Sequence, residues 1–451
     1  MIKSLFKISF MELAACVVLI SGVNYSLAAT SSCDGSLSDC QAKVNSAIDG
    51  DIITFPAGTF TWTTSLSFNS KNISIFGAGE DKTIINANGT GFDIRTDTKA
   101  AFRISNMTIN QKTGCVTAIK INNTKRTPTG GAYSTGWRVD HITITANDLN
   151  NVRSIFVYGL TYGLIDHVKW SSNYSIAQFL THYAFTNDNS EADGQPFNQG
   201  TISWSLAHSL GDANAIYVEH STLNASSTGG WAADVWYGGE VVFRYNTINR
   251  CQISTHGARN SARGGKRLEV YHNKLVGLGM KDKRVVWWRS GSGVVFNNSI
   301  DDIGYISVDN QRTCLEMATR CGVNGNLYDM NLDGTGWPCL DQPGRGYGAP
   351  LKQISNPIYA WNNGIQDDCR TTQITCKNTK NIEIGNDYEL CLTAAPPKLS
   401  THLKTGTGHV GGVVDYVNNS ETPKPGYIPY EYPHPLTMTT PLRVNNLSVI
   451  N

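Results

Sequence analysis

A six-residue pattern of apolar and polar positions recurs through most of the chain. Each copy reads apolar, any residue, polar or aromatic, Asn, small or polar, apolar, and clear copies begin at Phe243, Val270 and Val295. The third positions of these copies are 27 and 25 residues apart. Short strands that return at such an interval are typical of stacked repeats, because each repeat buries its inward face only against its neighbours. The pattern therefore predicts a solenoid of strands and not a single open sheet.

The pattern returns along nearly the whole chain after residue 100. The third positions of all eight copies are Asn106, His141, His167, His220, Tyr245, His272, Asn297 and Asn362. The intervals between them are 35, 26, 53, 25, 27, 25 and 65 residues, so 53 is close to two repeats. The interval of 35 contains a loop at residues 125–136, and the interval of 65 contains the Gly- and Cys-rich segment 311–350. We expect segment 311–350 to be a disulfide-braced C-terminal excursion from the side of the stack.

Residue choice within the copies indicates a ladder of side chains. Val, Ile, Thr and aromatic residues are frequent in these strands, and helical periodicity is scarce after residue 60. Asn at the strand ends suits turns with positive φ, and stacked Asn side chains can hydrogen-bond from one repeat to the next. The four histidines at third positions are therefore expected to belong to a ladder or to the core.

Both ends of the chain differ from the repeat. Residues 1–29 show basic residues, then an apolar run, then small residues, which is the order of a secretory signal peptide. A lipoprotein site at Cys16 is the alternative, although Glu12 interrupts the apolar run before it. A helix from Val44 to about Asp49 and a strand from Ile52 are expected to form a capping helix and first strand, within an N-terminal cap at residues 30–60. The Pro-rich residues 420–451 are expected to form an extended tail, so residues 30–451 are predicted to be one domain.

The composition is that of an exported protein, extracellular or periplasmic. Ten cysteines remain outside the signal peptide, an even number that favours disulfides. The closest pairs are Cys33 with Cys40, Cys314 with Cys321, and Cys369 with Cys376. A zinc site is the alternative, but no CxxC pair occurs. Outside the predicted signal peptide, 35 basic residues balance 35 acidic ones, and no other segment is long and apolar enough to cross a bilayer. We expect a monomer without a nucleic-acid or membrane partner after signal removal.

One sequence resemblance supports the repeat interpretation. The segment 50–60 (GDIITFPAGTF), followed by repeats of about 25 residues, resembles the pectate-lyase-like superfamily of right-handed parallel β-helices. Residues 337–342 and 424–436 resemble a group of exported bacterial β-helix repeat proteins. The resemblance implies an all-β fold, a right-handed parallel β-helix, over nearly the whole mature chain. It does not imply a substrate, because lyases, hydrolases and binding proteins share this architecture.

Basic residues gather between Arg244 and Arg289. This segment contains eleven basic and two acidic residues, in a chain that is otherwise near neutrality. Such an excess predicts positive potential on a few adjacent repeats and an anionic partner, for which an acidic polysaccharide is our expectation.

Cleavage of a uronate polymer by β-elimination needs a base, an acid and a cation for the substrate carboxylate. His256 suits the base, and Arg259, Arg263 and Arg289 suit the carboxylate. The candidate roles of Asp234 are to orient His256, to bind a metal or to cap a turn. Tyr237 and Lys266 are alternatives for the base or the acid. Further candidates for substrate binding are Lys266, Arg267, Tyr237, Trp236, Trp288 and His208. The resemblance makes Ca²⁺ a possible cofactor, although no compact set of oxygen ligands is visible.

Two other functions remain open at this stage. A glycoside hydrolase needs two carboxylates that flank the scissile bond. Asp212, Asp234 and Glu240 are candidates for such a pair, as are Asp166 with Asp188 or Asp193. A non-catalytic protein that binds a polysaccharide or a cell surface would use the same face without needing His256.

Overall fold

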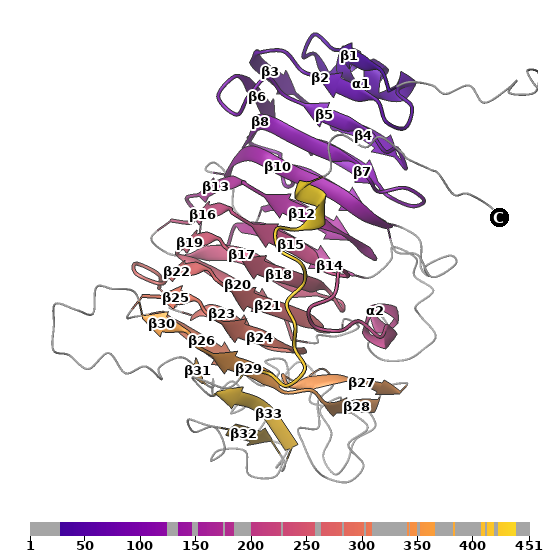
Figure 1. Cartoon of the computed structure of the whole chain (residues 1–451). Helices are drawn as coiled ribbons and strands as arrows, with labels where there is room; N and C mark the ends of the chain where they lie inside the picture. Colours follow the sequence, from indigo (N-terminus) through magenta and orange to yellow (C-terminus); the bar gives the residue numbers. More distant parts are fainter. Residues whose placement is uncertain are drawn as a thin grey trace, which may run out of the picture.

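The protein is a right-handed parallel β-helix, seen as a computed structural model in Figure 1, and the predicted fold class is confirmed. The structure describes residues 28–123, 134–146, 152–174, 176–184, 200–226, 229–257, 263–281, 284–301, 304–308, 341, 343–349, 352–365, 382–383, 407–410, 413–418 and 423–438. Residues 1–27 of the predicted signal peptide, most of loop 125–136 and most of excursion 311–350 lie outside these residues. Among the described residues, no helix is long and apolar enough to cross a membrane.

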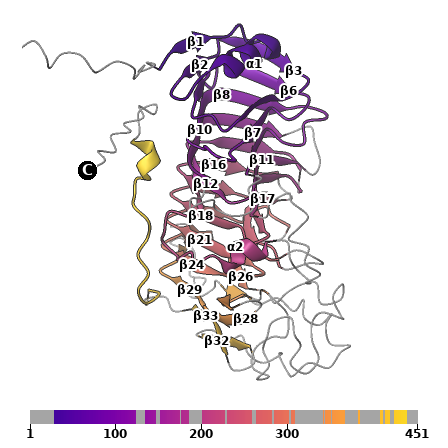
Figure 2. The ribbon, with the colours of Figure 1, turned by 90° about the vertical axis from the view of Figure 1, so that its right-hand side faces the viewer.

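The larger of the two main sheets has 21 strands, arranged as two stacks that share the long strands β8 and β10 (Figures 1 and 2). The first stack contains β1 (Thr30–Ser32), β2 (Ile52–Thr54), β5 (Ser74–Phe76), β8 (Arg103–Gln111), β10 (Ser134–Ala146), β12 (Thr161–Asp166), β15 (Ile216–Glu219), β18 (Glu240–Arg244), β21 (Arg267–Tyr271), β24 (Ser292–Phe296), β29 (Ile358–Trp361), β33 (Val413–Asn418) and β32 (Thr407–Val410). The second stack adds β3 (Gly58–Trp62), β6 (Thr83–Ala87), β13 (Lys169–Ser172), β16 (Thr222–Asn224), β19 (Thr247–Asn249), β22 (Lys274–Val276), β25 (Ser299–Ile300) and β30 (Gly364–Ile365).

The third face of the helix is a ten-stranded parallel sheet. It contains β4 (Leu66–Asn69), β7 (Phe92–Arg95), β9 (Ile119–Asn122), β11 (Arg153–Tyr158), β14 (Gln178–Tyr183), β17 (Gly230–Trp236), β20 (Cys251–Thr255), β23 (Arg284–Trp288), β26 (Tyr305–Val308) and β31 (Ile382–Glu383). A separate antiparallel hairpin consists of β27 (Arg345–Ala349) and β28 (Lys352–Ser355). One turn of the helix, which we call a rung, therefore contributes a strand to each face. Inward-pointing Val, Ile, Leu and aromatic side chains from all three faces form one continuous core.

The third positions of the sequence pattern lie at the bend between the first and second stacks. All eight have positive φ angles, between 48° and 62°. This left-handed conformation is costly for most residues and less so for Asn or His. The rings at these positions stack along the outside of the helix, with centroids 4.8 Å apart for His141 and His167 and 5.0 Å apart for Tyr245 and His272. Of the two predicted places for these histidines, a ladder or the core, the structure shows a ladder on the outside of the helix.

A buried asparagine ladder runs beside these rings. The Nδ2 atom of Asn246 donates to Oδ1 of Asn273 at 2.9 Å, and Asn273 donates in the same way to Asn298 at 3.0 Å. Asn298 continues the row to Asn363 at 2.9 Å. Each amide also donates to a backbone carbonyl of the preceding rung, so the ladder satisfies buried backbone groups at the bend.

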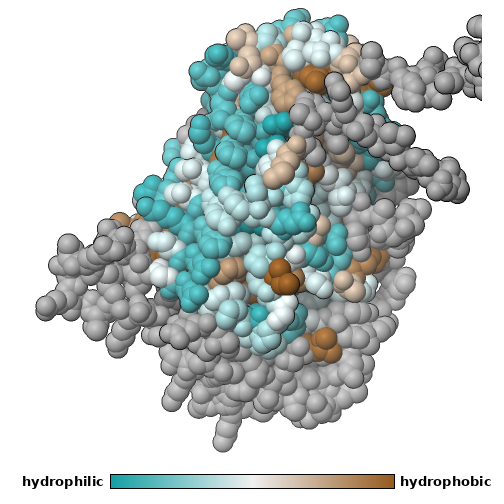
Figure 3. All heavy atoms as spheres, viewed as in Figure 1, coloured by the Kyte–Doolittle hydropathy of each residue, from teal (hydrophilic) through white to brown (hydrophobic). Residues whose placement is uncertain are grey.

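Residues 423–438 run along the outside of the first stack, and we call them the C-terminal strap (Figures 1 and 2, yellow). The guanidinium of Arg244 donates to the carbonyl oxygens of Tyr430 and Glu431, both at 2.7 Å. The hydroxyl of Tyr427 donates to Glu269 at 2.6 Å. The strap therefore contacts charged side chains that point outward from the sheet, and its Tyr427, Tyr430 and Leu436 pack on a cluster of buried hydrophobic residues there. Figure 3 shows that the visible surface on either side of the strap is mainly hydrophilic where the residues are described.

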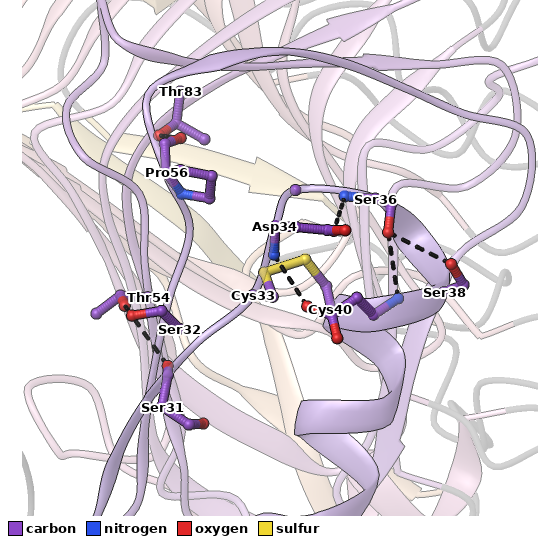
Figure 4. Close-up of a disulfide and its surroundings, with 12 residues drawn as sticks. Ser31, Ser32, Cys33, Asp34, Ser36, Ser38, Cys40, Thr54, Pro56 and Thr83 are labelled. Atoms are coloured by element: carbon purple, nitrogen blue, oxygen red, sulfur yellow. Dashed lines mark hydrogen bonds between the residues drawn. A yellow bond between two sulfur atoms is a disulfide. The ribbon is translucent and has the colours of Figure 1, made fainter.

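The helix α1 (Leu37–Ser46) covers the N-terminal end of the stack. It begins earlier than the predicted Val44, because the Ser36 hydroxyl caps it by accepting from the Asp39 backbone N–H. Cys40 and Val44 are buried beneath it, and Cys40 forms the expected disulfide with Cys33 (Figure 4). Cys115 and Cys251 are buried free thiols, so the predicted even set of disulfides does not include them. The other two close cysteine pairs lie outside the described residues.

Candidate functional site

Four of the candidate residues meet on the outer face of the ten-stranded sheet. Asp234 lies on β17 and pairs in register with Ser254 of β20, which pairs with Trp287 of β23. Trp236 ends β17, and His256 and Arg289 directly follow β20 and β23. Because equivalent positions of successive rungs are about 4.8 Å apart, residues distant in sequence become neighbours here.

Asp234 is the buried acid of this cluster. Its Oδ2 atom accepts from the indole N–H of Trp236 at 2.8 Å and from Gln178 at 3.3 Å. Its Oδ1 atom lies 3.6 Å from Nη2 of Arg289 and accepts no hydrogen bond within the described part of the chain. Burial raises the pKa of the Asp234 carboxyl above its ordinary value, although Arg289 and Trp236 act in the opposite direction. Such a carboxyl is suited to hold a proton and donate it.

His256 lies flat against Trp236 and is half-buried. The two ring centroids are 3.2 Å apart, with 20° between the planes. The Nδ1 atom lies 3.0 Å from the carbonyl oxygen of Gly257, which can only accept, so Nδ1 carries the proton in this contact. In the neutral ring the lone pair is then on Nε2, the form that accepts a proton. Trp236 thus joins the base candidate His256 to the acid candidate Asp234.

Arg289 is also in this cluster, but its side chain does not face solvent. Only 1% of the residue is exposed, and its guanidinium donates to the Thr255 carbonyl and the Ser254 hydroxyl, each at 3.2 Å. Trp287 covers it, with the ring centroid 4.1 Å from the guanidinium carbon. Arg289 is therefore placed to act on Asp234 and not to hold a polymer carboxylate directly.

A row of half-buried aromatic rings adjoins the cluster. Tyr158, Tyr183 and Trp236 occupy the same register position on β11, β14 and β17. Ring centroids are 5.8 Å apart for Tyr158 and Tyr183, and Tyr237 lies 4.7 Å from Tyr183. These rings are inclined to one another by 85° and 56°, and together they form a partly exposed aromatic surface along the stacking direction, which suits successive units of a chain-like ligand. We call Tyr158, Tyr183, Trp236 and Tyr237 the aromatic row.

Arg153 supplies a cation that the sequence prediction missed. It begins β11, is half-buried, and its guanidinium carbon lies 5.0 Å from the Phe156 ring and 5.6 Å from the Tyr183 ring. Its charge is among those that lower the pKa of Asp234. The sequence signal for this neighbourhood was present, because Tyr158, Tyr183 and Trp236 are spaced by 25 and 53 residues, close to the intervals of the repeat.

Two other candidates, Arg263 and Trp288, do not join the cluster. Arg263 is fully buried and forms a two-pronged ion pair with Asp341, at 2.7 and 2.6 Å. Its guanidinium is therefore committed to a protein carboxylate. Trp288 points into the hydrophobic core and is fully buried, where no sugar ring can contact it. Arg259 lies outside the described residues, so its assignment stays a prediction.

The remaining candidates line a separate cavity. His208, Lys266 and Arg267 surround about 370 Å³ together with Glu240 and the start of the C-terminal strap. The Nδ1 atom of His208 lies 2.5 Å from Oε1 of Glu240, and Lys266 donates to the same oxygen at 3.3 Å. This cavity belongs to the first stack, and segment 263–267 separates it from the cluster around Asp234, since Gly264 bridges to Trp236.

The predicted excess of positive charge is partly offset in the structure. Carboxylates, all but one of them from outside segment 244–289, pair with five of its eleven basic residues. These pairs are Arg244 with Glu219, Arg263 with Asp341, Lys266 with Glu240, Arg267 with Asp212 and Glu269, and Arg289 with Asp234. A local count of charges along the chain therefore overstated the positive potential of these rungs.

The carboxylates proposed as a catalytic pair for hydrolysis lie on different parts of the structure. Asp234 lies on the ten-stranded sheet, whereas Glu240 and Asp212 both lie near Arg267, beside the cavity. Asp166 forms an ion pair with Arg138 at 2.8 Å, and Asp188 and Asp193 lie outside the described residues. Within the described ranges, no group of three or more His, Cys, Asp or Glu side chains is arranged to hold a metal ion. The Ca²⁺ implied by the resemblance finds no matching donor set there, and we derive no step through it.

Comparison with known proteins identifies only distant structural neighbours. No family model and no curated protein matches the chain. Among solved structures, an alginate lyase from Paenibacillus sp. str. FPU-7 shares 14% identity at a TM-score of 0.38, covering 63% of this chain and 98% of the lyase. A pectin methylesterase in complex with a hexasaccharide shares 11% identity at a TM-score of 0.31, covering 55% of this chain and 88% of the esterase. We draw no conclusion about activity from these similarities.

Proposed function

We propose that the protein is an exported lyase that binds an acidic, uronate-containing polysaccharide on the outer face of the ten-stranded sheet and cleaves it by β-elimination. The observation that carries this proposal is the contact of Trp236 with both Asp234 and His256, beside the aromatic row. Export is supported by the Cys33–Cys40 disulfide, since disulfides persist mainly in oxidising compartments.

The aromatic row gives the polymer a binding surface. Half-buried rings from three rungs offer apolar faces to the C–H faces of sugar rings, and they run in the direction in which the rungs stack. Arg153 lies against this row and is the described cation best placed to neutralise a uronate carboxylate. A planar guanidinium holds a carboxylate through two parallel hydrogen bonds.

The chemistry is divided between His256 and Asp234. In β-elimination a base removes the proton on the carbon beside the uronate carboxylate, and the released electron pair forms a carbon–carbon double bond. The glycosidic oxygen leaves with the electrons of its bond to carbon and takes up a proton from an acid. His256 accepts the first proton through Nε2. Asp234, whose pKa is raised by burial, donates the second. Arg289 beside Asp234 stabilises the carboxylate that results.

The test is to incubate the purified mature protein with polygalacturonate, alginate and glucuronate-containing polymers. We expect at least one polymer to yield products with the ultraviolet absorbance of an unsaturated uronate, together with an equal number of new reducing ends. New reducing ends without this absorbance would show hydrolysis and overturn the eliminative mechanism. Retained binding without cleavage of any polymer would show a binding protein and overturn the enzymatic assignment.

A further inference from the structure

We propose that the cavity beside His208 and Glu240 is a second binding site, which takes an uncharged sugar residue through hydrogen bonds from its hydroxyl groups to Glu240 and Ser292. This site is separate from the aromatic row and does not depend on the cleavage proposed above.

The cavity is built by four parts of the chain. Its volume of about 370 Å³ lies within the range of small-ligand pockets, at its lower end. The walls come from the segment after α2 (Thr201–Ser205), from the first residues of β18, β21 and β24, from the hairpin β27–β28, and from the start of the C-terminal strap. A pocket enclosed by segments so distant in sequence has walls that the fold holds in place.

The cations in the wall are already engaged by protein groups. Lys266 donates to the carbonyl oxygens of Ser203 and Leu206 at 2.9 and 2.8 Å and to Glu240 at 3.3 Å, which uses all three of its N–H groups. Arg267 donates to Glu269 and Asp212, each at 2.6 Å. These side chains therefore shape the pocket and are not its main ligand-binding groups.

Two buried oxygen atoms in the cavity wall lack a hydrogen-bond partner among the described residues. Glu240 uses Oε1 for His208 and Lys266, whereas its Oε2 accepts no hydrogen bond from the described residues. The Ser292 hydroxyl likewise makes no hydrogen bond within the part of the chain that the structure describes. Both residues are at least 98% buried, and a buried polar atom without a partner is costly. A ligand that donates hydrogen bonds to both atoms satisfies them.

The charges around the cavity select an uncharged donor. Lys266 and the Nη1 atom of Arg267, 3.8 Å from Oε2 of Glu240, already place two positive charges beside the Glu240 carboxylate and so disfavour a cation. Burial opposes ionisation of Glu240, but Lys266, His208 and Arg267 outweigh it and lower its pKa, so the ionised carboxylate also disfavours an anion. Hydroxyl groups donate without bringing charge.

Size and lining agree with a sugar. Glu240, Arg267 and Ser292 occupy one register position on three adjacent strands. The backbones of the two acceptor residues, Glu240 and Ser292, are therefore roughly 10 Å apart, which is twice the strand spacing. Leu206, Leu210 and Tyr427 contribute apolar wall that suits the C–H face of a ring. A single hexose, or the end unit of a longer chain, has hydroxyl groups on both edges and an apolar face between them.

The experiment uses the full mature protein and titrates it with glucose, galactose, mannose and galacturonate, with binding followed by calorimetry and ligand-observed NMR. We expect at least one neutral hexose to bind more tightly than galacturonate. Ser292→Ala removes an acceptor without breaking a protein hydrogen bond of the described chain, and we expect it to weaken hexose binding about three- to tenfold. Ser205→Ala, on the exposed side of α2, is the matched control and leaves binding unchanged.

Three results would overturn the assignment. The first is that none of the four sugars binds with a Kd below about 100 mM, two decades weaker than a millimolar site. The second is that hexose binding is the same in Ser292→Ala as in the wild type. The third is that hexose binding is lost in Trp236→Ala and kept in Ser292→Ala, which would place the sugar on the aromatic row. None of these results bears on whether uronate polymers are cleaved.

Discussion

Replacement of Asp234 by Asn separates the proposed proton donor from the structure around it. Asn has nearly the same shape and keeps an oxygen that accepts from Trp236 and Gln178, but it has no carboxyl proton to donate. A positioned general acid contributes about 10²- to 10⁴-fold to a rate, so we expect kcat for uronate cleavage to fall by that factor. The aromatic row is untouched, so KM should change little.

The same substitution, which lowers activity, is expected to stabilise the folded protein at neutral pH. Burial raises the pKa of Asp234, so ionisation is less favourable in the folded protein than in the unfolded chain. The cost is absent below the ordinary Asp pKa of about 3.9, grows as pH rises above it, and is fully present above the folded pKa. We therefore expect Asp234→Asn to have a higher Tm than the wild type at pH 7, with the difference shrinking toward pH 4.

The assay combines steady-state kinetics on the cleaved polymer with thermal unfolding at both pH values. Asp93→Asn is a control, since Asp93 is a partly exposed carboxylate on β7 that pairs with Lys120. An unchanged kcat in Asp234→Asn would refute the role of Asp234 as proton donor. A Tm at pH 7 several degrees below that of the wild type would refute the argument that the ionised carboxyl is destabilising.

Three further predictions concern the ladder, the substrate cation and the cap. Asn273→Ala removes three hydrogen bonds that the side chain donates and two that it accepts in the buried ladder. It should lower the free energy of unfolding by about 3–5 kcal/mol in chemical denaturation. Asn249→Ala, on the surface, should lower it by less than about 1 kcal/mol. Equal losses in the two variants would contradict the ladder's role. Arg153→Ala should raise KM for the polymer about tenfold with a smaller effect on kcat, and Lys169→Ala, on another face, should not; an unchanged KM would remove Arg153 from the binding surface. Cys33→Ser with Cys40→Ser opens a crosslink between residues seven apart and should destabilise the N-terminal cap by about 2 kcal/mol in hydrogen exchange; unchanged protection of α1 would show that packing alone holds it.

The fold was accessible from the sequence because its signal is repeated. Each third position has a left-handed backbone, and from Tyr245 onward each is followed by an Asn whose side chain hydrogen-bonds at the bend, as in Tyr245 with Asn246 and His272 with Asn273. A requirement that returns in every rung leaves a pattern that a single sequence reveals. The start of α1 was harder to predict, because it depends on one cap at Ser36 and has no repeat.

The candidate site could be predicted only in part from the sequence, because its contacts join rungs that are separated by insertions along the chain. Asp234, His256 and Arg289, which the β-elimination hypothesis groups in one site, do meet on one face, whereas the candidate His208 lies in the separate cavity beside Glu240. Arg263 was misjudged because its partner Asp341 lies 78 residues away, beyond any local pattern. Side-chain direction was a second obstacle. Trp287 and Trp288 are adjacent in sequence, yet Trp287 covers Arg289 on the outside and Trp288 fills the core.

The most direct measurement of the central claim compares His256→Ala with the wild type on a uronate polymer, by the rate at which unsaturated product appears. His141→Ala is the matched control, because His141 is a partly exposed ladder histidine on a different face. The account predicts a loss of about 10²- to 10⁴-fold in kcat for His256→Ala and wild-type kinetics for His141→Ala. Wild-type kinetics in His256→Ala would contradict the assignment of His256 as the base.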